Sequence, residues 1–246
     1  MAAQRALSSR LLATSAPRAV AAGVWLVQGQ PGRLNVYLIE DGSGVTMFDA
    51  GGRSMAGPLH RAAESLGGLR RIVLGHAHTD HRGAAPALGV EVLCHADEVP
   101  DAEGSGGFRY WPRKLAGLPP AQRYSHRLLH TLWDAGPVTV AQTIGEGDTV
   151  AGFEVVHLPG HAPGLIALWR ASDKVALVSD AFYTIDMWAR HCPPVLPVKT
   201  YNYNTAQARE SLRKLAALEP AAAWSGHGRG VIGEVRRQLE NAAETA

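Results

Sequence analysis

Cysteine is scarce in this 246-residue chain, which contains only two, Cys94 and Cys192. They lie far apart and neither belongs to a CxxC pair, so the sequence argues against a disulfide framework and fits a reducing compartment. No apolar run reaches the roughly 18 residues that a membrane-spanning helix needs. Dense blocks of lysine and arginine are missing too, and the formal net charge is only +2. We therefore expect no membrane and no nucleic acid as a partner.

The first 20 residues contain arginine, serine and alanine, and no acidic residue precedes Glu40. Organellar transit peptides have such a composition, but here the alanine-rich and glycine-rich bias continues along the whole chain. We predict a flexible N-terminal tail over residues 1–20 and a cytoplasmic protein, with organellar targeting as the alternative. Residues 21–246 suffice for a full hydrophobic core, and we expect them to form a single domain.

The apolar pattern predicts an α/β fold in two similar halves. The first half is expected to contain, in order, strands at 24–27, 34–40 and 45–48, a helix around Leu59, a strand at 72–74, a short helix at 84–88 and a strand at 90–94. The second half is expected to contain strands at 138–144, 153–158, 165–170, 175–178 and 221–224, a loop marked by Pro193, Pro194 and Pro197, a helix capped by Thr205, and a last helix around Leu239. Because each sheet must bury its apolar face, we predict a four-layer αββα sandwich.

The segment between Glu98 and Ala135 breaks this regularity, since glycines and prolines interrupt any sustained pattern. A connection of this length inside a compact domain is usually functional. We therefore predict a lid-like insertion at about residues 98–135. Its aromatic residues are expected either to line a substrate pocket or to cover the core, and they are Phe108, Tyr110, Trp111, Tyr124 and Trp133.

The stretch HAHTDH, from His76 to His81, follows a short apolar run that reads as a buried strand. Gly75 lets the chain turn as it leaves the sheet, so the polar residues fall beyond the strand's carboxyl end, where ligand sites of layered α/β folds lie. Imidazole and carboxylate groups are suitable ligands for zinc, and also for iron or manganese. The stretch therefore predicts metal binding by His76, His78, Asp80 and His81.

Three later residues also follow apolar, strand-like runs. His161 lies in a Pro-Gly-His-Ala-Pro-Gly loop, Asp180 follows a strand that ends in serine, and His227 lies in a Gly-His-Gly sequence. A catalytic zinc ion uses three protein ligands and keeps one position open, so seven candidates are too many for one ion. They suit two ions that share a bridging carboxylate.

Alternation along the motif points His76 and His78 toward one ion, while Asp80 and His81 can reach the other. The expected sets are His76, His78 and His161 for the first ion, Asp80, His81 and His227 for the second, and Asp180 as the bridge. Two divalent ions about 3.5–4 Å apart lower the pKa of a water molecule between them, which gives a hydroxide nucleophile. Hydrolysis is therefore the expected reaction.

This set of motifs resembles that of the metallo-β-lactamase-fold hydrolases. It consists of the Asp49-Ala-Gly turn, the H-x-H-x-D-H run, the Pro-Gly-His-x-Pro-Gly loop, the Ser-Asp and the Gly-His-Gly, in that order along the chain. The resemblance covers about residues 24–240. It implies a metallo-β-lactamase-type αββα sandwich with a dinuclear site at one edge and the same ligand sets. It also implies two divalent metal ions, which we expect to be zinc, with iron or manganese as alternatives.

Among these hydrolases, the glyoxalase II-like thioesterases and the acyl-homoserine lactonase-like enzymes keep the full set of ligands. True metallo-β-lactamases generally lack the bridging aspartate, and flavodiiron proteins carry glutamate at the position of His78. Tyr183 falls where the lactonases place a tyrosine that hydrogen-bonds the substrate. The resemblance thus implies catalytic roles for Tyr183 and Asp80, and we expect Asp49 to orient a ligating histidine or the loop backbone.

The sequence therefore predicts a dinuclear metal-dependent hydrolase that cleaves a small-molecule carboxylic ester, lactone or thioester with a metal-bridging hydroxide as the nucleophile. One alternative is a persulfide dioxygenase-like enzyme, in which His76, His161 and Asp180 hold a single iron ion. A phosphodiesterase is the other, because phosphodiester cleavage uses the same paired metals.

Overall fold

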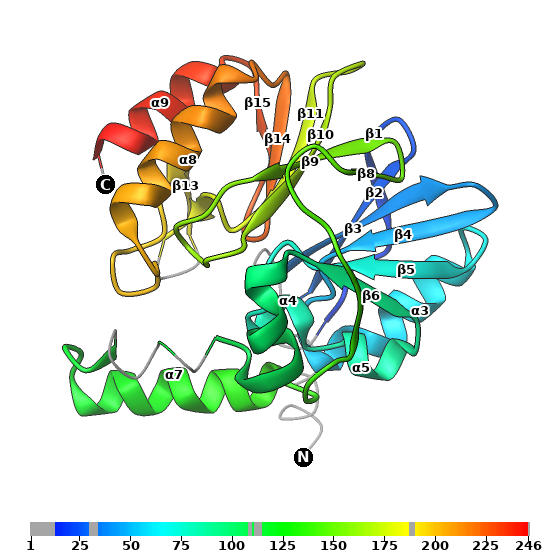
Figure 1. Cartoon of the computed structure of the whole chain (residues 1–246), viewed down its shortest axis with the longest axis horizontal. Coiled ribbons are helices and arrows are strands. Elements are labelled where there is room, and N and C mark those ends of the chain that lie inside the picture. Colours follow the sequence, from blue (N-terminus) through cyan, green and yellow to red (C-terminus); the bar gives the residue numbers. More distant parts are fainter. Residues whose placement is uncertain (1–12, 30–33, 108–109, 111–114, 187–189, 246) are drawn as a thin grey trace.

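The computed structural model describes residues 13–29, 34–107, 110, 115–186 and 190–245. Two large sheets face each other and carry helices on their outer sides, as Figure 1 shows. This arrangement confirms the predicted four-layer αββα sandwich. Among the described residues, no helix combines the length and the apolar character that crossing a membrane requires.

The first half of the chain builds a sheet of seven strands, ordered β1-β2-β3-β4-β5-β6-β7. Its elements are β1 (Arg18–Ala21), β2 (Val24–Gly29), β3 (Leu34–Asp41), β4 (Gly44–Phe48), η1 (Arg53–Met55), α3 (Ala56–Glu64), β5 (Leu69–Val73), α4 (Thr79–Arg82), α5 (Ala85–Leu88), β6 (Glu91–Cys94), η2 (Ala96–Glu98), η3 (Asp101–Ser105), α7 (Pro120–Trp133) and β7 (Val140–Thr143). Strands β1 to β4 are antiparallel, whereas β4 to β7 run parallel. The parallel strands therefore end at the same edge of the sheet.

The second half builds a sheet of six strands, ordered β15-β14-β11-β10-β9-β8. Its elements are β8 (Thr149–Val150), β9 (Phe153–His157), β10 (Ile166–Arg170), β11 (Val175–Ser179), β12 (Tyr183–Ile185), β13 (His191–Val195), α8 (Thr205–Ala217), β14 (Ala222–Ser225), β15 (Val231–Ile232) and α9 (Val235–Thr245). Strands β11 and β14 are parallel, and β12 and β13 form a separate pair.

Three apolar clusters correspond to the three interfaces between the four layers. One lies between the first sheet and α3, and includes Leu38 and Leu59. Another joins the two sheets through residues such as Phe48 and Phe153. The last lies between the second sheet and helices α8 and α9, and includes Leu212. Strand β3 is buried along most of its length because its alternate residues face two different clusters.

The predicted lid-like insertion contains a 14-residue helix, α7, where the sequence pattern indicated no regular structure. Pro119 and Pro120 interrupt the pattern in the sequence, yet they lie at the start of the helix, where a proline costs no hydrogen bond. Most of α7 is exposed, so it lacks the broad apolar face that reveals a buried helix. In Figure 1 it runs along one edge of the molecule, beside neither sheet.

The aromatic residues of the insertion have different surroundings. Trp133 packs against the core of the first half, and Tyr110 lies beside the predicted metal ligands. Tyr124 is 71% exposed on α7, in neither of the two expected settings. Phe108 and Trp111 fall outside the described residues.

Other local predictions differ from the structure near proline residues and where a helix or strand begins. The loop expected at Pro193 and Pro194 is strand β13, because an edge strand can accommodate residues that donate no hydrogen bond. Helix α8 is capped by Asn204, whose side chain accepts from the amide of Gln207, and not by Thr205. Strand β1 begins at residue 18, three residues before the boundary expected for the tail.

Candidate metal centre

The seven predicted ligands meet at one edge of the sandwich, where strands of both sheets end. The HAHTDH stretch follows β5, whereas His161, Asp180 and His227 follow β9, β11 and β14. Six of the side chains are buried and Asp80 is partly buried. Parallel pairing of β11 with β14 brings two of these strand ends side by side. The structure thus places all the candidates together.

One group of candidate ligands contains His76, His78 and His161. The Nδ1 atom of His78 lies 3.1 Å from Nε2 of His161. Asp180 borders the group, since its Oδ2 atom lies 3.4 Å from Nε2 of His161 and 3.9 Å from Nε2 of His76. Three imidazole nitrogens and one carboxylate oxygen therefore surround a common point.

A second group contains Asp80, His81 and His227. The Nε2 atoms of the two histidines are 3.3 Å apart, and Oδ2 of Asp80 lies 3.4 Å from Nε2 of His227. Asp180 borders this group as well, with Oδ1 at 3.3 Å from Nε2 of His81 and Oδ2 at 3.4 Å from Nε2 of His227. Asp180 is therefore shared by both groups.

These separations fit metal binding. Ligand atoms about 2.1 Å from a tetrahedral zinc ion lie about 3.4 Å from one another. Nε2 of His76 and Oδ1 of Asp180 are buried and have no hydrogen-bond partner within the described part of the chain, which is costly unless another group satisfies them. Gly226 leaves room beside Asp180 and His81, because a Cβ atom at this position would collide with both side chains. The donor set and its geometry thus suit two divalent cations.

Asp49 connects the histidines to the backbone around them. Its carboxylate accepts from Nδ1 of His81 at 2.9 Å, from the hydroxyl of Ser179 at 2.7 Å and from the amide of Gly75 at 2.8 Å. The Ser179 hydroxyl lies 3.0 Å from Nδ1 of His76. These contacts fix the ring orientations, so that Nε2 of both histidines points to the ligand groups. Asp49 therefore orients ligands and backbone together.

The second half of the chain is tied to strand β3 next to His227. The side chain of Asn35 donates to the carbonyl groups of Ser225 and Gly228, at 2.8 Å and 3.1 Å. Tyr37 donates to the same Ser225 carbonyl at 2.6 Å. Both side chains are buried. One sheet thus holds the loop through which the other sheet supplies a ligand candidate.

Several polar residues that hold the candidate ligands are not evident from the sequence. Asn35 is one, and Asn202, whose Oδ1 lies 3.4 Å from Nδ1 of His161, is another. Glu98 is a third, since its buried carboxylate accepts from the amides of Ala77 and Gly164. Each is a single polar residue without a motif around it. The only signal in the sequence is a polar residue close to an apolar run.

Two tyrosines add hydroxyl groups to the site. Tyr183, on β12, donates to Oδ2 of Asp180 at 2.8 Å. Tyr110, from the insertion, lies with its hydroxyl 2.6 Å from Nε2 of His78, which leaves Nδ1 of that ring for the first group. Burial raises the pKa of Tyr183 well above its usual value, and the Asp180 carboxylate raises it further. Tyr183 therefore keeps its proton and acts as a hydrogen-bond donor.

The two ligand groups differ in protonation. Burial lowers the pKa of His76 and of His78 well below the usual value, and neighbouring histidines add to the effect, so both rings are neutral. Burial also acts on His81 and His227, but nearby carboxylates, Asp180 foremost, outweigh it. They raise the pKa of His227 to about 9 and that of His81 well above its usual value. Metal binding to the second group therefore releases protons.

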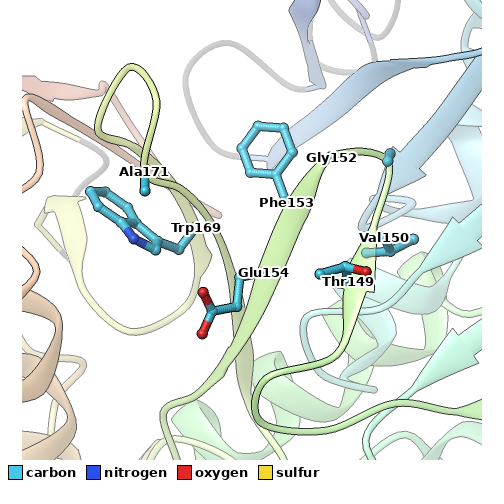
Figure 2. A pocket seen from close by; sticks show the side chains of 8 residues that line it. Thr149, Val150, Gly152, Phe153, Glu154, Trp169 and Ala171 are labelled. Atoms are coloured by element: carbon cyan, nitrogen blue, oxygen red, sulfur yellow. The ribbon is translucent and has the colours of Figure 1, made fainter.

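An open cavity of about 440 Å³ lies elsewhere on the molecule, between residues of β8, β9 and β10. Figure 2 shows Phe153, Glu154 and Trp169 around it. Phe153 and Glu154 begin strand β9, whereas His161 follows the other end of that strand. The cavity therefore does not belong to the candidate metal centre.

Comparison with known proteins agrees with this geometry. The Metallo-beta-lactamase superfamily model matches residues 29–227. The chain is 28% identical over 231 residues to "Probable metallo-hydrolase YflN" of Bacillus subtilis (strain 168), a match that spans 81% of this chain and 82% of the relative. The chain is thus similar to a metallo-hydrolase over most of both sequences.

Two solved structures are also similar to this chain. A metallo-beta-lactamase family protein from Thermus thermophilus is 25% identical, with a TM-score of 0.66, over 92% of this chain and 80% of that chain. The structure of TTHA1623 in a di-iron-bound form is 26% identical, with a TM-score of 0.60, over 89% of this chain and 94% of that chain. Since the family match spans every one of the seven candidate ligands, the chain belongs to the metallo-beta-lactamase superfamily.

Proposed function

We propose that this metallo-hydrolase uses its histidine-rich dinuclear site to cleave a small-molecule carboxylic ester, lactone or thioester. The observation that carries the proposal is the position of Tyr183, whose hydroxyl donates to the carboxylate shared by both ligand groups. Two divalent metal ions, when bound, supply a hydroxide nucleophile at neutral pH and polarise a substrate carbonyl. The residues of the chain provide the ligands, their orientation and one neutral donor.

Tyr183 is the donor expected to contact the substrate. Its side chain is half-buried, and its ring lies near His161 and His227, with centroids 6.2 Å and 4.9 Å away. One histidine belongs to each ligand group, and the Tyr183 hydroxyl donates to the Asp180 oxygen that lies 3.4 Å from Nε2 of both. A donor at this point can stabilise the charge that develops on a carbonyl oxygen or on a leaving oxygen or sulfur. This role supports acyl substrates.

Asp80 and Asp180 are the two carboxylates among the candidate ligands. If two ions are bound, Asp180 would be a ligand of both and Asp80 a ligand of the second, with a catalytic role proposed for Asp80 as well. Coulombic attraction to His81 and hydrogen bonding to His227 oppose the effect of burial and hold the pKa of Asp80 well below its usual value. Asp80 is therefore ionised at neutral pH, as a metal ligand must be.

A panel of substrates tests this proposal. The protein loaded with zinc, manganese or iron is expected to hydrolyse lactones, aryl esters or thioesters faster than phosphodiesters, because a neutral donor suits an oxyanion that develops on a carbonyl. Rates are measured with each metal and after chelation, which is expected to remove the activity. Preference for phosphodiesters, or oxygen consumption with a persulfide instead of hydrolysis, would contradict the proposal.

Replacement of Tyr183 by phenylalanine tests the donor. Loss of one oxyanion donor costs about 100-fold in rate, so kcat is expected to fall by about that factor while the metal content stays unchanged. Steady-state kinetics on the best substrate of the panel measure the effect. Tyr124→Phe, at an exposed position on α7, is the matched control and is expected to behave as the wild type. An unchanged kcat for Tyr183→Phe would exclude the proposed role.

A further inference from the structure

Glu98 connects two loops that carry metal-ligand candidates. It ends the short helix η2 and its side chain is completely buried. One carboxylate oxygen, Oε2, accepts from the amide of Ala77 at 2.8 Å. The other, Oε1, accepts from the amide of Gly164, also at 2.8 Å. A single side chain thus spans the two halves of the protein.

The two amides belong to the loops that supply the first ligand group. Ala77 lies between His76 and His78, and Gly164 is three residues beyond His161. The backbone also joins these loops, because the amide of Ile166 donates to the carbonyl of Gly75 at 2.8 Å. Glu98 adds its two bonds closer to the ligands. The second ligand group is held by other side chains, through the contacts of Asp49 and Asn35 described above.

The packing around Glu98 is close. A Cβ atom at position 164 would lie 2.9 Å from Cγ of Glu98, so glycine allows the loop to approach the carboxylate. Burying a carboxylate is costly unless hydrogen bonds compensate the charge. Bonds from backbone amides to an ionised carboxylate are short and strong. The two amides together require two acceptor oxygen atoms, and the carboxyl group of Glu98 provides both.

We propose that Glu98 is a positioning residue that sets the spacing between the loop of His76 and His78 and the loop of His161, and thereby the metal affinity of the first ligand group. The inference rests on the proposed dinuclear site. Glutamine has the same shape as glutamate but carries only one acceptor oxygen. In a Glu98→Gln variant the side-chain NH2 group faces one of the two backbone N–H groups, and two donors cannot form a hydrogen bond. One of the two loops therefore loses its hydrogen bond to residue 98.

The test is a stepwise titration of the metal-free full-length protein with zinc or cobalt. Nitrogen-15 NMR of the histidine rings identifies which ligand group each equivalent fills. Loss of an interaction that orients metal ligands typically costs 10-fold to 100-fold in affinity, so Glu98→Gln is expected to weaken the first group by about that factor. The second group is expected to keep its wild-type affinity. This difference between the groups is one that general destabilisation does not produce.

Glu103→Gln is the matched control. Its carboxylate also accepts from a backbone amide, that of Val140 at 3.0 Å, but at an exposed position away from the ligands. It is expected to bind both equivalents as the wild type does. Equal weakening of both groups in Glu98→Gln, or no weakening at all, would overturn the inference. A wild-type protein that binds a single ion would instead refute the proposed dinuclear function, so the two failures are distinguishable.

Hydrogen exchange on the wild type keeps the inference testable if Glu98→Gln does not fold. The amides of Ala77 and Gly164 are expected to be strongly protected in the metal-free protein, and to the same extent, because one buried carboxylate holds both. Fast exchange at either amide in the folded protein would show that Glu98 does not hold the loops, and would overturn the inference.

Discussion

Replacement of Asp180 by asparagine is expected to lower kcat/KM by about a thousandfold or more and to reduce the metal content from about two equivalents to about one. The carboxylate lies within 3.4 Å of nitrogen atoms from both ligand groups, His161 on one side and His227 on the other. An amide is neutral, so its oxygen binds two neighbouring cations far more weakly than an ionised carboxylate does. Losing the stabilisation that a metal ion gives to charge in the transition state raises the activation free energy by several kcal/mol, and each 1.4 kcal/mol lowers the rate about tenfold.

The change at Asp180 is measured by elemental analysis of metal content together with steady-state kinetics. Asp173→Asn provides a matched surface control, since Asp173 pairs with Arg170 between β10 and β11, away from the metal centre. The control is expected to keep both the metal content and the rate. An Asp180→Asn protein that retains two equivalents and a near-wild-type rate would show that Asp180 is not a bridging ligand.

Replacement of Arg82 by methionine is expected to destabilise the protein by about 3 to 5 kcal/mol, because it leaves three backbone carbonyl groups and the partly exposed Asp134 carboxylate without their donor. Arg82 is completely buried. Its Nη1 atom donates to the carbonyl groups of Asp101, Ala102 and Gly104, at 2.6 to 3.0 Å. Its Nη2 atom donates to both carboxylate oxygens of Asp134. The guanidinium thus holds the beginning and the end of the insertion together.

Thermal unfolding measures this effect. For a domain of this size the expected loss corresponds to a decrease in Tm of roughly 10 °C. Arg82→Lys is expected to recover little of it, because an ammonium group cannot replace the planar fork of donors. Arg236→Met removes an exposed arginine that pairs with Glu219 and Glu240, and solvent screening is expected to leave its Tm almost unchanged. Equal Tm values for Arg82→Met and Arg236→Met would contradict the assignment of Arg82 as a structural clamp.

The layers of the fold could be predicted from the sequence because burial on both sides of a sheet leaves a strong pattern. Strand β3 has an unbroken apolar run from Val36 to Ile39, and helix α3 shows Leu59, Ala62 and Ala63 at helical spacing. Helix α7 could not be predicted in the same way, because most of its residues face solvent. Strand β13 contains two prolines, so its residues argue locally for a loop. Its pairing with β12 depends on a partner strand and not on its own composition.

The ligand candidates were also predictable, since histidine and aspartate directly after an apolar run are unusual outside metal sites. The residues that hold them were not. Glu98 supports Ala77 and Gly164, which lie 21 and 66 residues away along the chain. Asn35 binds carbonyl groups about 190 residues away. Contacts over such distances leave no periodicity or spacing in the sequence.

Local chemistry along the chain was enough to indicate the fold class, the seven candidate ligands and the reaction type that paired metals support. Each of these follows from apolar periodicity and from the kinds of side chain at strand ends. The folded arrangement was needed to show that Tyr183 donates to Asp180, and that Glu98 and Arg82 hold the surrounding loops. These features depend on the relative position of segments from both sheets, which packing between the layers sets and no single segment encodes.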